Sequence, residues 1–258
     1  MRASPLKVFI TGASSGIGLA LASHYAARGA LLGLAARRGE LLTGLAHRLG
    51  PSAMAFPLDV ADSLALKSAA AEFIAQHGSP DIVIANAGIS CASEGGDFRD
   101  IEILSRTLAV NVTGLAATLL PFIEAMKANR HGALVGIASV AGLRGFPGSG
   151  AYSASKAAVI AWLESLRVEL RGSGVRVVTI CPGYIETPMT AVNRFPMPFL
   201  LSADEGARRI ARAIDRGASL TILPWQMRLV SLFLRRMPNW LFDRLFEHTP
   251  RKPRMPTA

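Results

Sequence analysis

The chain has 258 residues, of which half are apolar and 18% are charged, and it carries a formal net charge of +10. This balance fits one large globular α/β domain and excludes an intrinsically disordered chain. The positive charge is not accompanied by a nucleic-acid recognition motif, so no nucleic-acid partner is predicted.

Targeting and metal signals are weak along the whole chain. Residues 1–12 lack the apolar core and cleavage site of a signal peptide. The longest uncharged stretch, 107–123, is just too short to span a membrane and is expected to form a buried helix. The two cysteines, Cys91 and Cys181, are expected to be reduced thiols of a cytoplasmic protein. The five histidines lack metal-ligand spacing, so no metal site is predicted.

Short apolar runs alternate with helical patterns from the N-terminus onward. Strands are predicted at 6–11, 30–36, 53–56, 81–85, 133–138, 175–180 and 220–223. Helices are predicted from the first glycine loop to about 28, at 41–49, from about 60 to 77, at 101–128, at 152–170 and after a capping box at 202–205. This alternation predicts an α/β fold with a doubly wound parallel sheet over residues 1–223. A basic, apolar extension, 224–258, is expected to add two short helices divided at Pro238.

A glycine-rich loop directly follows the first predicted strand. It reads Thr11-Gly12-Ala13-Ser14-Ser15-Gly16-Ile17-Gly18. Glycine allows positive φ and close approach of a pyrophosphate, and the next helix offers free N–H groups and the positive end of its dipole. The spacing differs from the usual G-x-G-x-x-G, and an ordinary glycine turn is the alternative. Between a strand and a helix, the loop favours a dinucleotide phosphate site.

Tyr152 and Lys156 are four residues apart on a predicted helix and therefore share one face. A phenol titrates near ~10, so an acid–base catalyst at neutral pH needs its pKa lowered by about 3 units, or roughly 4 kcal/mol. An ammonium about 4 Å away supplies on the order of 4 kcal/mol at an effective dielectric of about 20. Lys156 is therefore expected to do most of this tuning.

Further motifs follow the glycine loop in a fixed order. They are Asn86-Ala87-Gly88, Ser139, Tyr152-x3-Lys156 and Pro182-Gly183. Over about residues 6–223 this set resembles the short-chain dehydrogenase/reductase family, in its shorter single-domain branch. The resemblance implies a Rossmann fold and an oxidoreductase that moves a hydride between a nicotinamide dinucleotide and a carbonyl or alcohol.

The resemblance also implies roles for four catalytic residues. Ser139 would hold the substrate oxygen, Tyr152 would transfer the proton, and Lys156 would tune Tyr152 and bond the nicotinamide ribose. Asn111 would bend a long helix and hold a water that links Lys156 to solvent. A packing role alone is the alternative for Asn111.

Arg37 and Arg38 follow the second predicted strand, where this fold reads the adenosine ribose. A guanidinium there pairs with a 2′-phosphate, so NADP(H) is expected rather than NAD(H). Because Ser14 and Ser15 occupy loop positions that are basic in some family members, this expectation depends mainly on Arg37. Solvated arginines are the alternative. The resemblance adds further cofactor contacts at Asp59, Val60, Asn86, Ala87, Gly88, Pro182, Gly183, Ile185 and Thr187.

The substrate is expected to be hydrophobic, such as a lipid-like ketone, because the loop 189–201 and the segment after Pro224 are rich in apolar residues. That loop packing on its own domain is the alternative. Three interpretations of the segment after Pro224 remain open: a lid, a subunit contact, or a membrane-surface helix. By resemblance, the helices at 101–128 and around Tyr152 predict a homodimer or homotetramer. A nucleotide-sensing or membrane-binding protein without turnover is the rival function.

Overall fold

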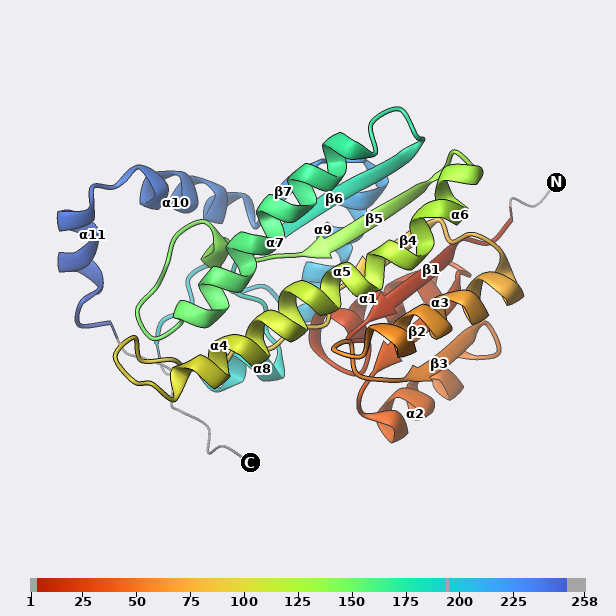
Figure 1. Ribbon diagram of the computed structural model, residues 1–258, viewed down its shortest axis with the longest axis horizontal. Helices are drawn as coiled ribbons and strands as arrows, with labels where there is room; N and C mark the ends of the chain where they lie inside the picture. The colour runs from red at the N-terminus through yellow and green to blue at the C-terminus, as the bar shows by residue number, and fades with distance from the viewer. Residues whose placement is uncertain (1–3, 194, 250–258) are drawn as a thin grey trace.

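Seven parallel strands form one sheet in the computed structural model, which describes residues 4–193 and 195–249 (Figure 1). The strands are β1 (Lys7–Thr11), β2 (Leu31–Ala36), β3 (Ala53–Pro57), β4 (Ile82–Ala85), β5 (Gly132–Ile137), β6 (Val175–Pro182) and β7 (Leu220–Leu223). Their spatial order is β3-β2-β1-β4-β5-β6-β7. The predicted doubly wound Rossmann sheet is confirmed.

Helices cover both faces of the sheet. They are α1 (Gly16–Ala26), α2 (Gly39–Leu49), α3 (Ser63–His77), α4 (Asp100–Leu108), α5 (Gly114–Leu119), α6 (Ile123–Ala128), α7 (Gly150–Glu169), α8 (Pro188–Ala191), α9 (Ala203–Asp215), α10 (Trp225–Arg236) and α11 (Asn239–Phe246). The Ser202 hydroxyl caps α9 by accepting from the Glu205 N–H, as predicted, at 3.3 Å. The Glu205 carboxylate turns instead to Arg208 and Arg209.

The two cores follow from the alternation of side chains along each strand. In β1, Val8 and Ile10 point to the face covered by α1, α2 and α9, whereas Phe9 points to the face covered by α3, α5 and α7. The Phe9 ring lies 5.6 Å from Phe73 and 5.0 Å from Phe122, centroid to centroid. All of these β1 side chains are fully buried, so β1 is the centre of the domain.

The predicted long helix at 101–128 is present as one helical stretch, 100–128, but it is not α-helical throughout. A π-helical turn, Ala109–Thr113, joins α4 to α5, and a 3₁₀ turn, Leu120–Phe122, joins α5 to α6. Pro121 lacks an N–H, which accounts for the second interruption. By length and composition, 100–128 is the one helical stretch in the described chain that could cross a membrane. Here it packs against the sheet, with Leu115, Leu119 and Met126 buried in the core.

The strand order reverses between β1 and β4, which are neighbours in the sheet. The loops after these two strands therefore lead to opposite sides, and a crevice opens at their carboxyl ends. The glycine loop and Asn86-Ala87-Gly88 lie at this crevice.

The segment after Pro224 packs onto the same domain. Met227 of α10 is buried next to Gly183, and the rings of Phe242 and Phe246 contact Phe146. Figure 1 shows α10 and α11 at one end of the molecule, beyond the sheet. The basic residues of the extension's tail, Arg251, Lys252 and Arg254, lie outside the described residues.

Candidate functional site

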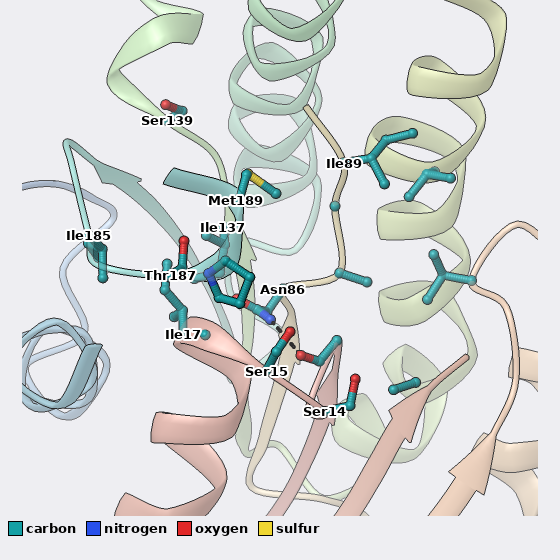
Figure 2. A pocket seen from close by; sticks show the side chains of 18 of the residues that line it. Ser14, Ser15, Ile17, Asn86, Ile89, Ile137, Ser139, Ile185, Thr187 and Met189 are labelled. Atoms are coloured by element: carbon teal, nitrogen blue, oxygen red, sulfur yellow. Dashed lines mark hydrogen bonds between the residues drawn. The ribbon is translucent and has the colours of Figure 1, made fainter. Parts of the chain in front are cut away.

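A pocket of about 590 Å³ follows the crevice along the carboxyl ends of the strands. Most of the predicted cofactor and catalytic residues line it: Gly12, Ser14, Ser15, Gly16, Ile17, Arg37, Arg38, Asp59, Val60, Asn86, Ala87, Gly88, Ser139, Tyr152, Lys156, Pro182, Gly183, Ile185 and Thr187. Figure 2 shows Ser14 and Ser15 toward one end of the pocket and Ser139 toward the other. The fold thus brings together motifs that lie as far apart in the sequence as positions 12 and 187.

Three predicted site residues lie behind the pocket wall instead. Thr11, Gly18 and Asn111 are not among the lining residues, and the side chains of Thr11 and Asn111 are buried. The Thr11 hydroxyl accepts from the N–H groups of Asn86 and Ala87 at 3.2 and 3.3 Å. These residues shape the site without facing the pocket.

The glycine loop approaches the loop after β4 very closely. A Cβ at Gly18 would lie 2.3 Å from the Gly12 carbonyl oxygen, and Gly12 itself has a φ of +70°. The Asn86 amide donates to the carbonyls of Thr11 and Gly12 at 3.0 and 3.4 Å. Asn86 therefore braces the glycine loop in addition to lining the pocket. A larger residue at 18 would push this loop away from the first turn of α1, and one at 12 would push it away from Ala87, whose Cα lies 2.8 Å from a Cβ built there.

Both arginines after β2 face the pocket, and they make different contacts. Arg38 donates to the Ser14 hydroxyl at 3.0 Å and to the Ser15 hydroxyl at 2.6 Å. Arg37 lies 3.7 Å from the Asp59 carboxylate and remains half exposed. Arg38 therefore provides the cation that the glycine loop itself lacks, across 24 positions of sequence from Ser14.

The catalytic candidates converge at the end of β5. Ser139 follows this strand, while Tyr152 and Lys156 lie in the first turns of α7. The Lys156 ammonium is buried and donates to the Ile137 carbonyl at 2.7 Å. It lies 5.8 Å from the centroid of the Tyr152 ring. A phenol, a hydroxyl and a cation thus meet at one place on the pocket wall.

Burial dominates the electrostatics of Tyr152 and Lys156. Burial raises the pKa of Tyr152 above its ordinary 10, and a hydrogen bond with Ser139 acts in the opposite direction more weakly. Burial also lowers the pKa of Lys156 to about 8. The Lys156 ammonium therefore has two neighbours here, the Ile137 carbonyl to which it donates and the Tyr152 ring. The tuning of Tyr152 by Lys156 therefore stays a prediction.

Asn111 lies in the π-helical turn and ties three elements together. Its amide donates to the Ile89 carbonyl and the Ser155 hydroxyl, each at 2.9 Å, and its oxygen accepts from the Ile89 N–H at 2.8 Å. A Cβ at Gly88 would lie 3.2 Å from the Asn111 oxygen and 3.6 Å from the Lys156 ammonium nitrogen. The absent side chain at position 88 therefore leaves space between these two polar groups.

Several residues that line this pocket were not predicted as part of the cofactor site, although two of them belong to the predicted substrate loop 189–201. Ile89, Ile137, Met189 and Thr190 line the pocket beside the predicted motifs. The Thr190 hydroxyl accepts from the Thr187 N–H at 3.0 Å and donates to the Ile185 carbonyl at 2.7 Å. The threonine pair at 187 and 190, three apart at a helix start, is the signal that could have indicated this capping contact.

Cys181 lies behind the catalytic candidates at the end of β6. It is a free thiol, as is Cys91, and it is fully buried. Burial raises the pKa of Cys181 to about 12. The thiol therefore stays protonated and is a packing residue rather than a nucleophile.

A second cavity of about 400 Å³ adjoins the first and shares Ser139, Tyr152, Gly183, Met189 and Thr190 with it. Its other walls come from the loops at 140–149 and 184–198 and from the helices after Pro224. Most of these side chains are apolar: Leu143, Phe146, Met189, Phe195, Met227, Val230, Leu234 and Phe246. The inner faces of α10 and α11 therefore form a lid over this cavity, and part of the loop 189–201 lines it.

Arg144 is the one charged side chain among the described residues that line this second cavity. Its guanidinium donates to the carbonyls of Leu234 and Met237 and to the Asn239 side chain. It also stacks over the Phe242 ring, 4.0 Å from the centroid. Arg144 is thus engaged in holding the junction of α10 and α11.

Comparison with known proteins is consistent with this geometry. The sequence profile of the short chain dehydrogenase family matches residues 7–196. An oxidoreductase of Myxococcus xanthus, described as uncharacterized, is 39% identical over 237 residues, 91% of this chain and 93% of that protein. The chain belongs to the short-chain dehydrogenase/reductase family. It is an oxidoreductase of this family, as the motif pattern predicts.

Two solved structures of the family resemble this short-chain dehydrogenase/reductase closely. One is a short chain dehydrogenase from Burkholderia cenocepacia in complex with NADP, 26% identical, with a TM-score of 0.82 and coverage of 97% of this chain and 100% of that chain. The other is a 3-ketoacyl-(acyl-carrier-protein) reductase from Brucella melitensis complexed with NADH, 26% identical, with a TM-score of 0.78 and coverage of 84% and 96%. The cofactor is thus a nicotinamide dinucleotide.

The pocket of this dehydrogenase fits such a cofactor. The cradle formed by the glycine loop, where Gly12 and Gly16 line the pocket with positive φ, can take a pyrophosphate at the start of α1, where the Ser15 side chain makes no capping hydrogen bond. The two arginines lie near that cradle, and Tyr152 and Lys156 also line the pocket, together with Ser139. A dinucleotide would therefore lie with its adenosine at the arginines and its nicotinamide beside Tyr152.

The raised pKa of Tyr152 leads to a spectroscopic prediction. Burial raises the pKa of all three tyrosines, Tyr25, Tyr152 and Tyr184, above 10. Below pH 10 the free protein should therefore show almost no phenolate absorbance near 295 nm. Adding oxidised cofactor should lower the pKa of Tyr152, because a nearby positive charge stabilises the phenolate, and absorbance should then appear below pH 10.

A Tyr152→Phe variant titrated in parallel assigns this signal. The cofactor-induced absorbance should be missing from that variant and unchanged in Tyr25→Phe. A phenolate that appears in the free wild-type protein near pH 7 would show that Tyr152 is tuned without cofactor.

Proposed function

We propose that this protein is an NADP(H)-dependent reductase of hydrophobic ketones, with Ser139, Tyr152, Lys156 and Asn111 as its catalytic set. The observation behind the proposal is that one phenol, Tyr152, lines both the dinucleotide pocket and the apolar cavity. A carbonyl in that cavity lies within reach of a proton donor and of the nicotinamide end of the pocket.

The preference for NADP(H) follows from charge at the adenosine end. Arg37 and Arg38 face the pocket there, and Arg38 is held by two serine hydroxyls. Asp59 is the acid at this end of the pocket, and it is paired with Arg37. Two guanidiniums and two hydroxyls suit a phosphate monoester better than a ribose 2′-hydroxyl.

In the reaction, the hydroxyls of Ser139 and Tyr152 hold the carbonyl oxygen of the substrate. The bound nicotinamide supplies the hydride. Tyr152 gives its proton to that oxygen, and the raised pKa keeps this phenol in its donor form before turnover. Tyr152 regains a proton by way of Lys156. The route continues through the space at Gly88, which lies between Lys156 and Asn111.

The substrate class follows from the walls of the second cavity. Its lining is mostly apolar, and Arg144 is already engaged by backbone carbonyls and a ring. An anionic substrate would find no free cation among the described lining residues. A ketone with an alkyl, ring or acyl portion suits this cavity, and the 3-ketoacyl reductase of Brucella melitensis acts, by its name, on such a group.

A series of methyl ketones of rising chain length tests this proposal. Each methylene buried in the cavity contributes about 0.8 kcal/mol, so kcat/KM with NADPH should rise about fourfold per methylene until the cavity of about 400 Å³ is filled. Keto acids of matched length are the control, because their carboxylate would be buried without a partner. A flat profile across the series, or better turnover of the keto acids, would contradict the proposal.

A further inference from the structure

Helix α10 has two apolar faces, although the substrate cavity uses only one of them. Met227, Val230, Ser231 and Leu234 line the cavity. The opposite side carries Trp225, Leu229, Leu232 and Phe233, which are 65%, 58%, 49% and 64% exposed. A helix that packs on a domain in water normally presents a polar outer face. Sealing the cavity therefore does not explain these outer residues.

The next helix continues this exposed apolar surface. Phe242 and Phe246 of α11 turn inward to Phe146, while Trp240 and Leu245 are 70% and 57% exposed. Figure 1 shows α10 and α11 together at one end of the molecule. We call the exposed apolar set of these two helices the lid outer face: Trp225, Leu229, Leu232, Phe233, Trp240 and Leu245.

Arginines accompany the lid outer face. Arg228, Arg235 and Arg236 lie on α10, which contains no acid, and all three are exposed. At helical spacing, Arg236 continues the stripe of Trp225, Leu229 and Leu232, and Arg228 and Arg235 follow one edge of it. Within residues 4–193 and 195–249, no ion pair joins these three arginines to an acid. The α10 part of the surface is both apolar and cationic, whereas α11 carries Asp243 beside Arg244.

This combination selects its partner by chemistry. Tryptophan and phenylalanine beside arginine suit the boundary between acyl chains and anionic headgroups, where rings enter the apolar layer and guanidiniums meet phosphate. A second copy of the chain would bring the same arginines against each other, on a protein whose net charge is already +10. An anionic bilayer satisfies the apolar and the cationic groups together.

We propose that the lid outer face is a membrane-docking surface that binds anionic lipid bilayers. The aromatic rings enter the headgroup layer, and the arginines of α10 bind lipid phosphates. Because the inner faces of the same two helices line the apolar cavity, docking places that cavity next to the phase in which hydrophobic molecules dissolve.

Flotation of the full-length protein with vesicles tests this surface without any turnover. Wild-type protein should float with phosphatidylcholine vesicles that contain phosphatidylglycerol, at low salt, and should bind pure phosphatidylcholine vesicles much more weakly. A charge variant, Arg228→Gln with Arg235→Gln and Arg236→Gln, should lose about 100-fold in partitioning, since each arginine near such a surface is worth about 1 kcal/mol. An aromatic variant, Trp225→Gln with Phe233→Gln and Trp240→Gln, should lose binding at least as strongly.

Two matched controls remove similar groups elsewhere. Leu64→Gln with Val168→Gln removes exposed apolar side chains, and Arg48→Gln with Arg167→Gln and Arg171→Gln removes three exposed charges. Both controls should float like the wild type. Two of the three tryptophans, Trp225 and Trp240, lie on the lid outer face, so their emission should shift to shorter wavelength on anionic vesicles.

Several outcomes would overturn the proposal. They are a wild-type protein that stays unbound at low salt, equal binding to both kinds of vesicle, and variants that float unchanged. If the aromatic variant instead converts an oligomer to a monomer in light scattering, with vesicle binding intact, the face is a subunit contact. Since the readout is binding, this result is separate from the outcome of the ketone series.

Discussion

Replacing Tyr152 by Phe is expected to lower kcat for ketone reduction by about 100- to 10,000-fold, the range that a positioned acid contributes. The phenylalanine ring keeps the packing beside Lys156 and removes only the hydroxyl that lies between the two cavities. Binding of NADPH, measured by fluorescence titration, should stay within about threefold of the wild type, because the lost group acts on the substrate oxygen.

Tyr25→Phe is the matched control for this prediction. Tyr25 is a fully buried phenol of α1 in the core, and its hydroxyl has no hydrogen-bond partner among the described residues. Its removal should leave kcat unchanged. A Tyr152→Phe enzyme that keeps more than about one tenth of wild-type kcat would show that another group provides the proton, since loss of the acid costs at least about 100-fold.

Replacing Arg37 and Arg38 together by Ala is expected to lower kcat/KM with NADPH by about 100- to 1000-fold. A hydrogen bond between charged groups is worth about 1.5–3 kcal/mol, and each 1.4 kcal/mol is about tenfold. We expect a loss in the lower part of the range that two such bonds allow, because Arg37 is half exposed and already forms an ion pair with Asp59. With NADH, which lacks the 2′-phosphate, kcat/KM should change by less than about threefold.

Single variants divide the effect between the two arginines. Arg38→Ala should also release Ser14 and Ser15, which it now contacts, so we expect the larger loss there. Arg48→Ala removes an exposed charge from the far end of α2, outside the pocket, and should leave both cofactors unaffected. Equal losses with NADPH and NADH would mean that the arginines bind a part common to both cofactors, and the preference for NADP(H) would be wrong.

Much of the site was determined by local sequence. The glycine loop, Asn86-Ala87-Gly88, Ser139 and the Tyr152–Lys156 pair each lie at or just beyond the end of a strand, or at the start of a helix, where the sequence places them. In a parallel sheet the carboxyl ends of the strands share one edge, so positions read from short segments are enough to gather these residues. The order of the motifs along the chain then indicated the family.

Other features depended on contacts between distant residues. Arg38 reaches Ser14 and Ser15, and Lys156 donates to Ile137. Arg144 donates to the carbonyls of Leu234 and Met237, which lie 90 and 93 positions away in the sequence. The interruptions of the helix at 100–128 place Asn111 against Ile89 and Ser155. None of these contacts leaves a periodic signal in its own segment.

Short segments of the chain are enough to identify its chemistry, because apolar periodicity, glycine positions and the tyrosine–lysine spacing are local properties. How that chemistry is enclosed depends on the packing of distant elements. That packing gave the segment after Pro224 a cavity-facing side and an exposed side, and it set the burial that shifts the pKa values of Tyr152 and Lys156. Burial depends on which distant elements pack around a residue, and a pattern of neighbouring residues along the chain does not contain that information.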